Sequence, residues 1–304
     1  RRMLSCLSFA LFFGTTAACA NAQSERSVHD PTLFGKYMCG ERSTIFDAPT
    51  LLTWGSSQEK ASPEPLGSIT TDRPDFTEAS STVGAGVAQL EIGYTFTHDN
   101  DSVAVGSHST PEALFRIGTH INWLELRLAA NLLQENVGSV ADRAAEDLYL
   151  GTKLGLTTQD GIFPEMALVP QMTVPTGGSA FTNNQVLPGV NWLYGWDVTD
   201  CLTTAGSTQV NRAVDSGTGS SYTEWAQSWT MGYALHDRVG MYSEWFALMP
   251  DNAETAQVEH YGNGGFTFLL NDDIQWDIRA GVGLNDAADD YFLGTGLSIR
   301  YRNR

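Results

Sequence analysis

The feature that most constrains this chain is a two-residue alternation of apolar and polar side chains that begins at Val87 and recurs to the end. In the stretch VAQLEIGYTFTH, the apolar residues at positions 90, 92, 94 and 96 point to one side, whereas Gln89 and Glu91 point to the other. Such a segment forms a strand with one apolar face and one polar face. The alternation therefore predicts an all-β protein.

Twelve segments share this pattern, and most are about ten or more residues long. A tilted strand of about 9–11 residues is long enough to cross a bilayer. No amphipathic helix of ordinary length competes with these strands after Val87. The segments span residues 87–98, 112–120, 123–132, 147–156, 162–174, 188–198, 201–212, 222–235, 238–249, 260–271, 273–284 and 291–302.

The links between these segments alternate between short turns and longer polar stretches. The longer links are predicted at 99–111, 134–145, 175–187, 213–220, 250–259 and 285–290. Outer-membrane barrels alternate short periplasmic turns with longer outer loops, whereas a β-sandwich has no reason to do so. The sequence thus predicts a transmembrane antiparallel up-and-down β-barrel of about 12 strands. Because that number is even, both termini are expected on the periplasmic side.

Composition narrows the function classes. The chain of 304 residues carries 17 Lys and Arg against 35 Asp and Glu, a formal net charge of -18. Such an acidic balance argues against nucleic acid as a partner, because phosphates need a basic surface. The 30 glycines and the aromatic content of 11% suit a β-rich protein with aromatic girdles.

The N-terminal stretch is typical of an export signal. Arg1 and Arg2 precede a short apolar run, and small residues before position 22 offer cleavage sites, so residues 1–22 are predicted to be a signal peptide. Residues 23–67 show no sustained period and are predicted to form a flexible extension, which leaves 68–304 for the barrel and its lead-in. Outside the signal peptide, Cys39 and Cys201 either form a disulfide or stay as thiols.

The polar face of each strand is expected to line the barrel interior. Charges of both signs there have two interpretations, either a network of mutual ion pairs that fills the lumen or a polar path for a solute. Both can hold in a barrel of this size. The lumen-lining candidates are Glu91, Arg116, His120, Glu125, Arg127, Lys153, Glu165, Glu224, Glu244, Asp277, Arg279 and Arg300.

Two aromatic residues share a face with one of these candidates. Tyr242 and Phe246 are each two positions from inward Glu244, so their side chains also point inward. They either line a pocket for an aromatic or apolar solute or pack structurally. The chain has no nucleophile elbow, no HExxH and no glycine-rich phosphate loop. We therefore predict no enzyme activity, no catalytic residues, no cofactor and no metal site.

The stretch TDRPDFTE directly before the first strand carries a resemblance. It resembles the MetA-pathway of phenol degradation family of outer-membrane transporters, whose members begin with this stretch and continue with QxExGY. The matching positions are Thr71 to Glu78, with the motif residues Asp72, Arg73, Pro74 and Asp75, followed by Gln89, Glu91, Gly93 and Tyr94. WLELRL at 123–128 and TVPTG at 173–177 are also similar to the family. The resemblance implies a β-barrel with a role in the uptake of aromatic compounds.

The motif residues are expected where the extension meets the first strand, on the periplasmic side, with Arg73 paired to acidic neighbours or to lumenal charges. Whether this stretch only leads into the barrel or enters the lumen and partly closes it is left open. The end of the chain, with Gly296, Ile299 and Tyr301, resembles the C-terminal signal of the bacterial barrel-assembly machinery.

The leading functional prediction is an outer-membrane channel for the passive passage of small solutes, with aromatic or apolar compounds as candidates. The alternatives are a barrel enzyme that acts on lipids and a structural or adhesive outer-membrane protein, with a soluble secreted β protein as the fallback. The expected location is the outer membrane of a Gram-negative cell. The expected partners are outer-membrane lipid and lipopolysaccharide, the barrel-assembly machinery and a small-molecule solute.

Overall fold

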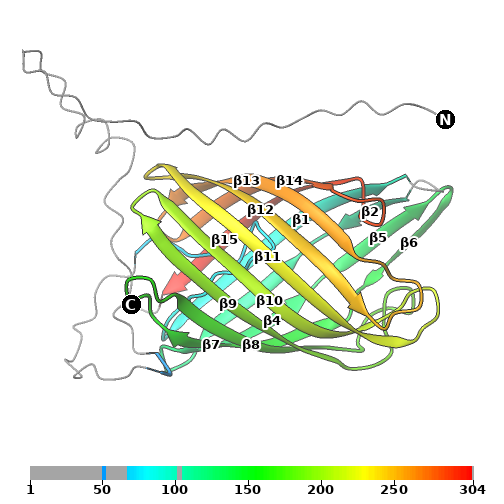
Figure 1. Cartoon of the computed structure of the whole chain (residues 1–304), viewed down its shortest axis with the longest axis horizontal. Helices are drawn as coiled ribbons and strands as arrows, with labels where there is room; N and C mark the ends of the chain where they lie inside the picture. Colours follow the sequence, from blue (N-terminus) through cyan, green and yellow to red (C-terminus); the bar gives the residue numbers. More distant parts are fainter. Residues whose placement is uncertain (1–49, 53–66, 101–104, 303–304) are drawn as a thin grey trace, which may run out of the picture.

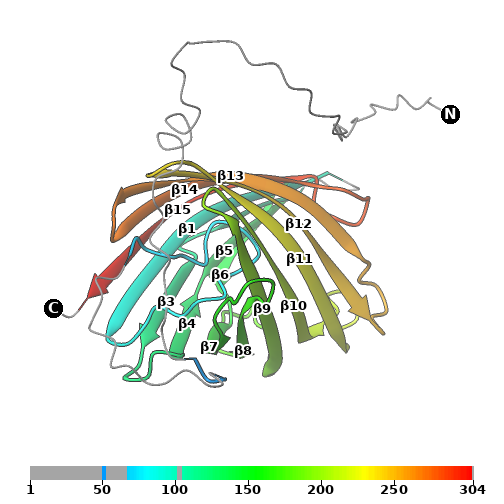
Figure 2. The ribbon, with the colours of Figure 1, turned by 60° about the vertical axis from the view of Figure 1, so that its left-hand side comes forward.

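The computed structural model describes residues 50–52, 67–100 and 105–302 of the chain, and the predicted signal peptide and most of the predicted extension lie outside these residues. All strands belong to one antiparallel sheet, which closes on itself because the last strand pairs with the first. Figures 1 and 2 show the resulting barrel from two directions.

The sheet contains fifteen strands. They are β1 (Val87–Asp99), β2 (Val105–Ser109), β3 (Ala113–Gly118), β4 (Leu124–Ala130), β5 (Leu132–Val137), β6 (Val140–Ala145), β7 (Leu148–Thr157), β8 (Glu165–Val174), β9 (Leu187–Thr199), β10 (Leu202–Val214), β11 (Ser221–His236), β12 (Val239–Asp251), β13 (Glu259–Asn271), β14 (Ile274–Gly283) and β15 (Tyr291–Arg302).

Three pairs of consecutive strands each occupy one position around the barrel. The pairs β2 with β3, β4 with β5 and β6 with β7 are each interrupted by only a few residues, so the fifteen strands make a barrel of 12. The predicted 12-strand antiparallel barrel is therefore confirmed.

Two of the predicted links were wrong in detail. The stretches 99–111 and 134–145 contain β2, part of β5 and β6, which continue the sheet beyond β3, β4 and β7. We call these three strands the flange. Both faces of the flange carry polar residues, so its strands lack the apolar alternation by which the others were predicted.

Each strand alternates between the lumen and the outside. On β1, Gln89 and Glu91 are buried inside, whereas Leu90 and Tyr94 are exposed outside. The register continues this pattern around the barrel, since Gln89 lies opposite Arg116 of β3. The buried interior consequently contains many polar and charged side chains, while the exposed face is largely apolar.

The two ends of the barrel differ. The links at 119–123, 158–164, 200–201, 237–238 and 272–273 form the turn end, where β1 begins and β15 ends. The links at 175–186, 215–220, 252–258 and 284–290 and the tip of the flange form the opposite, loop end (Figure 1). The described residues contain no helix long and apolar enough to cross a membrane.

Residues 67–86 do not lie outside the barrel. They run through its interior before β1 begins, and their side chains and backbone contact strands on every side of the lumen, from β3 to β15. We call this stretch the lumen segment; it is the cyan chain inside the barrel in Figure 2. The question that the sequence left open is thus resolved in favour of a segment inside the lumen.

Candidate functional site

Three buried glutamates of the barrel wall hold the backbone of the lumen segment. Glu91 accepts hydrogen bonds from the backbone N–H groups of Asp72 and Arg73, each at 3.1 Å. Glu244 accepts from the N–H groups at positions 76 and 77, at 2.8 and 2.7 Å. Glu125 accepts from the N–H group at position 83, at 2.8 Å. We call Glu91, Glu125 and Glu244 the wall glutamates.

Asp72 lies at the centre of a buried cluster of cations. Its carboxylate is 2.8 Å from Lys153 Nζ, 3.0 Å from Arg127 Nη2 and 3.3 Å from Arg116 Nη1. These cations come from β7, β4 and β3, so one side chain of the lumen segment joins three strands. Glu78 adds a second carboxylate, 2.6 Å from Arg127 Nη2. Arg116 also pairs with Glu91 and Glu125 of the wall. For Arg127 and Lys153, the carboxylates within 4.0 Å among the described residues come from the lumen segment.

Arg73 reaches in another direction. Its Nη1 lies 2.8 Å from Glu112, and its Nε lies 3.5 Å from Asp277 of β14. The guanidinium lies flat against the wall over Gly93 and Gly296, where a Cβ atom added to either glycine would come within 2.2 Å of it. Any larger side chain at either glycine would displace Arg73. The absence of a side chain at these two positions therefore leaves the space that the Arg73 guanidinium occupies.

An aromatic stack lies beside this polar network. The ring of Phe76, from the lumen segment, stacks on Phe246 of β12 with centroids 4.5 Å apart and planes within 2°. Phe246 in turn stacks on Tyr261 of β13 at 4.8 Å. Phe292 packs against both wall rings, and together with Ala288 they form a buried cluster. Of the two aromatics singled out from sequence, Phe246 thus contacts the lumen segment directly.

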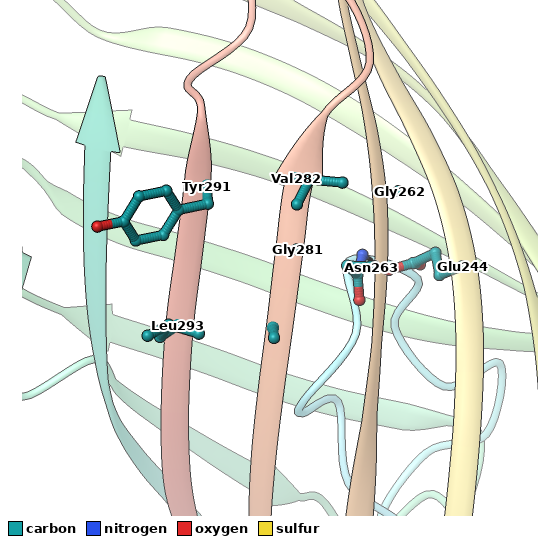
Figure 3. Close-up of a pocket in the computed structure, with 8 residues that line it drawn as sticks. Glu244, Gly262, Asn263, Gly281, Val282, Tyr291 and Leu293 are labelled. Carbon is teal, nitrogen blue, oxygen red and sulfur yellow. Dashed lines mark hydrogen bonds between the residues drawn. The ribbon is translucent and has the colours of Figure 1, made fainter. Parts of the chain in front are cut away.

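An open hollow lies in the wall next to this stack. Glu244 and Asn263 face inward and are hydrogen-bonded at 2.7 Å, whereas Tyr291 and Leu293 lie on the outer face nearby. Gly262 and Gly281 lie between them, and all six residues line the same mainly apolar hollow (Figure 3).

Acidic side chains gather at the loop end of the lumen. Glu224 accepts a hydrogen bond from Tyr222, and Glu259 accepts one from Tyr261. In the link after β14, burial and the neighbouring charge of Glu259 raise the pKa of Asp289 to about 6. This part of the interior therefore carries negative charge, in contrast to the balanced region around the lumen segment.

Most of the predicted lumen-lining residues face the lumen. Glu91, Arg116, Glu125, Arg127, Lys153, Glu244, Asp277 and Arg300 are buried there, and Glu165, Glu224 and Arg279 are half-buried. His120 is different: β3 ends at Gly118, and His120 is exposed in the following turn. Its assignment to the lumen was wrong because the strand is shorter than the alternation indicated.

The motif residues lie within the lumen rather than at its rim. Asp72 and Arg73 make the contacts above, the carbonyl oxygen of Pro74 accepts a hydrogen bond from Arg279, and Asp75 lies near Glu244. Glu112 was not among the predicted lumen-lining residues, although it begins the periodic segment at 112–120; it lies in the link between β2 and β3. Glu78, at the end of the TDRPDFTE stretch, pairs with the lumenal charge of Arg127.

The sequence matches the model of a known protein family over most of its length. Residues 71–301 match the family model described as "Putative MetA-pathway of phenol degradation". The chain belongs to this family. The match begins within the lumen segment, so the family pattern includes the stretch that crosses the barrel interior as well as the wall. No curated protein matches the chain in sequence.

Solved structures establish the fold. An outer membrane channel from Pseudomonas putida F1 is similar with a TM-score of 0.60 and 10% identity, covering 73% of this chain and 98% of that chain. The NanC porin (TM-score 0.44, 13% identity, 70% and 98% covered) and the translocator domain of the autotransporter NalP from Neisseria meningitidis (0.48, 9%, 72% and 89%) are weaker likenesses and support no argument. This chain thus has the fold of an outer-membrane β-barrel.

A disulfide-bonded cysteine and two backbone hydrogen bonds from the extension lie at the turn end. Cys201, between β9 and β10, is disulfide-bonded, and Cys39, its candidate partner from sequence, lies outside the described residues. The backbone N–H groups of Leu51 and Leu52 donate to carbonyl oxygens of β7, so this part of the extension contacts the turn end of the barrel.

Among the described residues, no group of three or more His, Cys, Asp or Glu side chains could hold a metal ion.

Proposed function

We propose that this protein is an outer-membrane channel through which small apolar or aromatic solutes pass passively, with the lumen segment as the element that opens and closes the path. The observation that carries the proposal is the way this segment is held. Its backbone is bound by the wall glutamates through hydrogen bonds, and its side chains are bound by ion pairs with the wall. Polar contacts of this kind can be exchanged for water when the segment moves.

The aromatic stack supports the solute class. Phe76 and Phe246 present parallel ring faces in an interior that is otherwise polar, and a flat aromatic solute can replace either ring in such a stack. Displacement of the lumen segment would remove Phe76 and leave the faces of Phe246 and Tyr261 available. The description of the family, phenol degradation, agrees with a solute of this chemistry.

The proposal includes export and no catalysis. An N-terminal signal peptide would carry the chain across the inner membrane, and the barrel-assembly machinery would insert it, with the turn end in the periplasm and the loop end outside. We propose no catalytic step, because the lumenal charges described above pair with one another or with the lumen segment.

A disulfide across the lumen tests the proposal. The hydroxyl oxygens of Thr77 and Ser228 are 2.6 Å apart and buried, so cysteines at these positions lie within bridging distance. In planar bilayers and in liposomes with an aromatic solute, oxidised T77C/S228C is expected to lose conductance and solute flux. Addition of a reductant is expected to restore both to the level of the unmodified protein.

The matched control shares one cysteine with the test variant. Ser207 and Ser228 are hydrogen-bonded at 2.7 Å across β10 and β11, so S207C/S228C joins two wall strands and leaves the lumen segment free. This variant is expected to conduct equally when oxidised and reduced. Equal flux through oxidised and reduced T77C/S228C would exclude the lumen segment as the gate, and an absence of flux from every form would exclude the channel.

A further inference from the structure

Polar side chains form a row across the outer face of the flange, on the side that faces away from the lumen. The row consists of His108 on β2, Gln134 on β5 and Arg143 on β6, and we call these three residues the rim row. They are directly opposite one another in the strand register, in which His108 pairs with Gln134 and Gln134 pairs with Arg143. Cross-strand partners share one face of a sheet, so the three side chains are neighbours.

The direction of this face follows from β1. Phe96 lies opposite His108, and Phe96 belongs to the outward set of β1, as exposed Tyr94 does. The Tyr94 hydroxyl is 2.8 Å from Nδ1 of His108, which places both side chains on the outer face. Adjacent strands are about 4.8 Å apart, so the row spans about 10 Å from β2 to β6.

Charge is segregated between the two faces of the flange. The inward positions carry two acidic residues, Glu135 of β5 and Asp142 of β6, which lie directly opposite each other in the strand register. The outward positions carry hydrogen-bond donors and the cation of Arg143. Arg143 is exposed and has no acidic partner within 4.0 Å among the described residues.

The position of the row along the barrel matters as well. Tyr94 and Phe96 are part of the outward aromatic group at this end of β1, and Tyr291 of β15 packs against Phe96 with ring centroids 6.2 Å apart. Aromatic side chains of this kind concentrate at the membrane interface, where one end is apolar and the other is hydrated. The rim row therefore lies beside the level at which lipid headgroups meet the barrel, at the loop end.

We propose that the rim row binds the anionic headgroup of a phosphorylated glycolipid of the outer leaflet. Arg143 supplies a planar guanidinium that bonds phosphate through two N–H groups. Gln134 and His108 supply further N–H donors in line with it, and Phe96 with Tyr94 contacts the upper part of the acyl chains. An extended headgroup with several oxygens fits a row of donors about 10 Å long better than a single small anion does.

The test uses the full-length protein in detergent with EDTA, so that divalent cations do not bridge acidic side chains to phosphate. Native mass spectrometry measures binding of a bis-phosphorylated glycolipid of the lipid A type, of the same glycolipid after dephosphorylation, and of inorganic phosphate. The protein is expected to retain the phosphorylated glycolipid and to bind the dephosphorylated one about tenfold more weakly. The variant H108Q/R143Q is expected to lose the same factor.

The matched control is R212Q. Arg212 is also exposed, on the outward face near the loop end, but on β10 away from the flange. The R212Q variant should bind the phosphorylated glycolipid as the unmodified protein does. Both R212Q and H108Q/R143Q should keep the heat-dependent gel mobility of a folded barrel. Equal loss in R212Q, or equal binding of the dephosphorylated glycolipid, would overturn the proposal. Competition by an equal concentration of inorganic phosphate would assign the row to free phosphate and would overturn it too.

Discussion

At the scale of single residues, the interior is organised around charges that no strand could neutralise alone. Arg116 and Lys153 are almost completely buried, and each lies within 3.3 Å of Asp72. A buried ion pair offers little net stability compared with an apolar core, but the loss of one partner leaves an uncompensated charge that is costly. Asp72 is therefore the residue whose removal should affect the barrel most.

The substitution Asp72→Asn tests this point. It keeps the shape of the side chain but leaves Arg116, Arg127 and Lys153 with one carboxylate fewer, so we expect the barrel to lose about 3–5 kcal/mol of unfolding free energy. Urea unfolding in detergent, followed by gel mobility, measures the change. The double variant D72N/K153M should recover part of it, and Asp160→Asn, at an exposed turn position, should change nothing. Wild-type stability of D72N would show that the cluster is not a stabilising unit.

At the scale of elements, the prediction from sequence succeeded where one face of a strand meets apolar surroundings and the other does not. That condition creates the period of two, and it holds for the strands that cross the membrane. It does not hold for the flange, whose strands carry polar residues on both faces, nor for the end of β3, where the turn begins before His120. Strand boundaries outside the apolar band depend on hydrogen bonding with neighbours that a sequence pattern does not record.

The longer links at the loop end are also elements with internal order. Asp215, after β10, accepts hydrogen bonds from the backbone N–H group at 217 and from the N–H groups of Glu254 and Ala256. Both the hydroxyl and the backbone N–H of Thr255 also donate to it. These bonds hold the pKa of Asp215 below its usual range, with the Thr255 hydroxyl as the largest cause. One carboxylate thus joins two links that are distant in sequence.

We expect Asp215→Asn to loosen both links without opening the barrel. Because the folded-state pKa is depressed, the contribution of the carboxylate is present above the ordinary pKa of about 3.9 and is lost as the pH falls through the lower folded value. Hydrogen exchange at residues 215–220 and 251–258 should therefore be faster in the variant at pH 7. After correction for intrinsic rates, the difference should shrink at pH 3. Unchanged exchange at pH 7 would show that other contacts order these links.

At the scale of the whole molecule, the lumen segment fills the interior of the barrel and closes it. It contacts wall strands on opposite sides, through Glu125 of β4 on one side and Glu244 of β12 on the other. It also contributes Asp72 and Phe76 to two separate clusters. Interior width in a barrel grows with strand number, and 12 strands leave more space than their own side chains fill. The segment occupies that space.

Deletion of residues 68–86 should therefore have two effects. Single-channel conductance should rise because the lumen loses its occupant, and thermal stability in detergent should fall because Arg116, Lys153 and Glu125 lose partners. Planar bilayer recording and gel mobility after heating measure both effects. A deletion variant that folds and conducts no better than the full chain would locate the closure elsewhere in the barrel.

The sequence by itself determined the barrel, its strand number and the face on which most charged residues lie, because the membrane imposes a period of two that is visible in a single segment. It also marked the TDRPDFTE stretch as distinctive. Only the tertiary structure decided that this stretch crosses the lumen, that Asp72 meets three cations from three strands, and that Phe76 stacks on Phe246. These are contacts between positions as far apart as 170 residues, and they depend on the closure of the sheet, which no local pattern encodes.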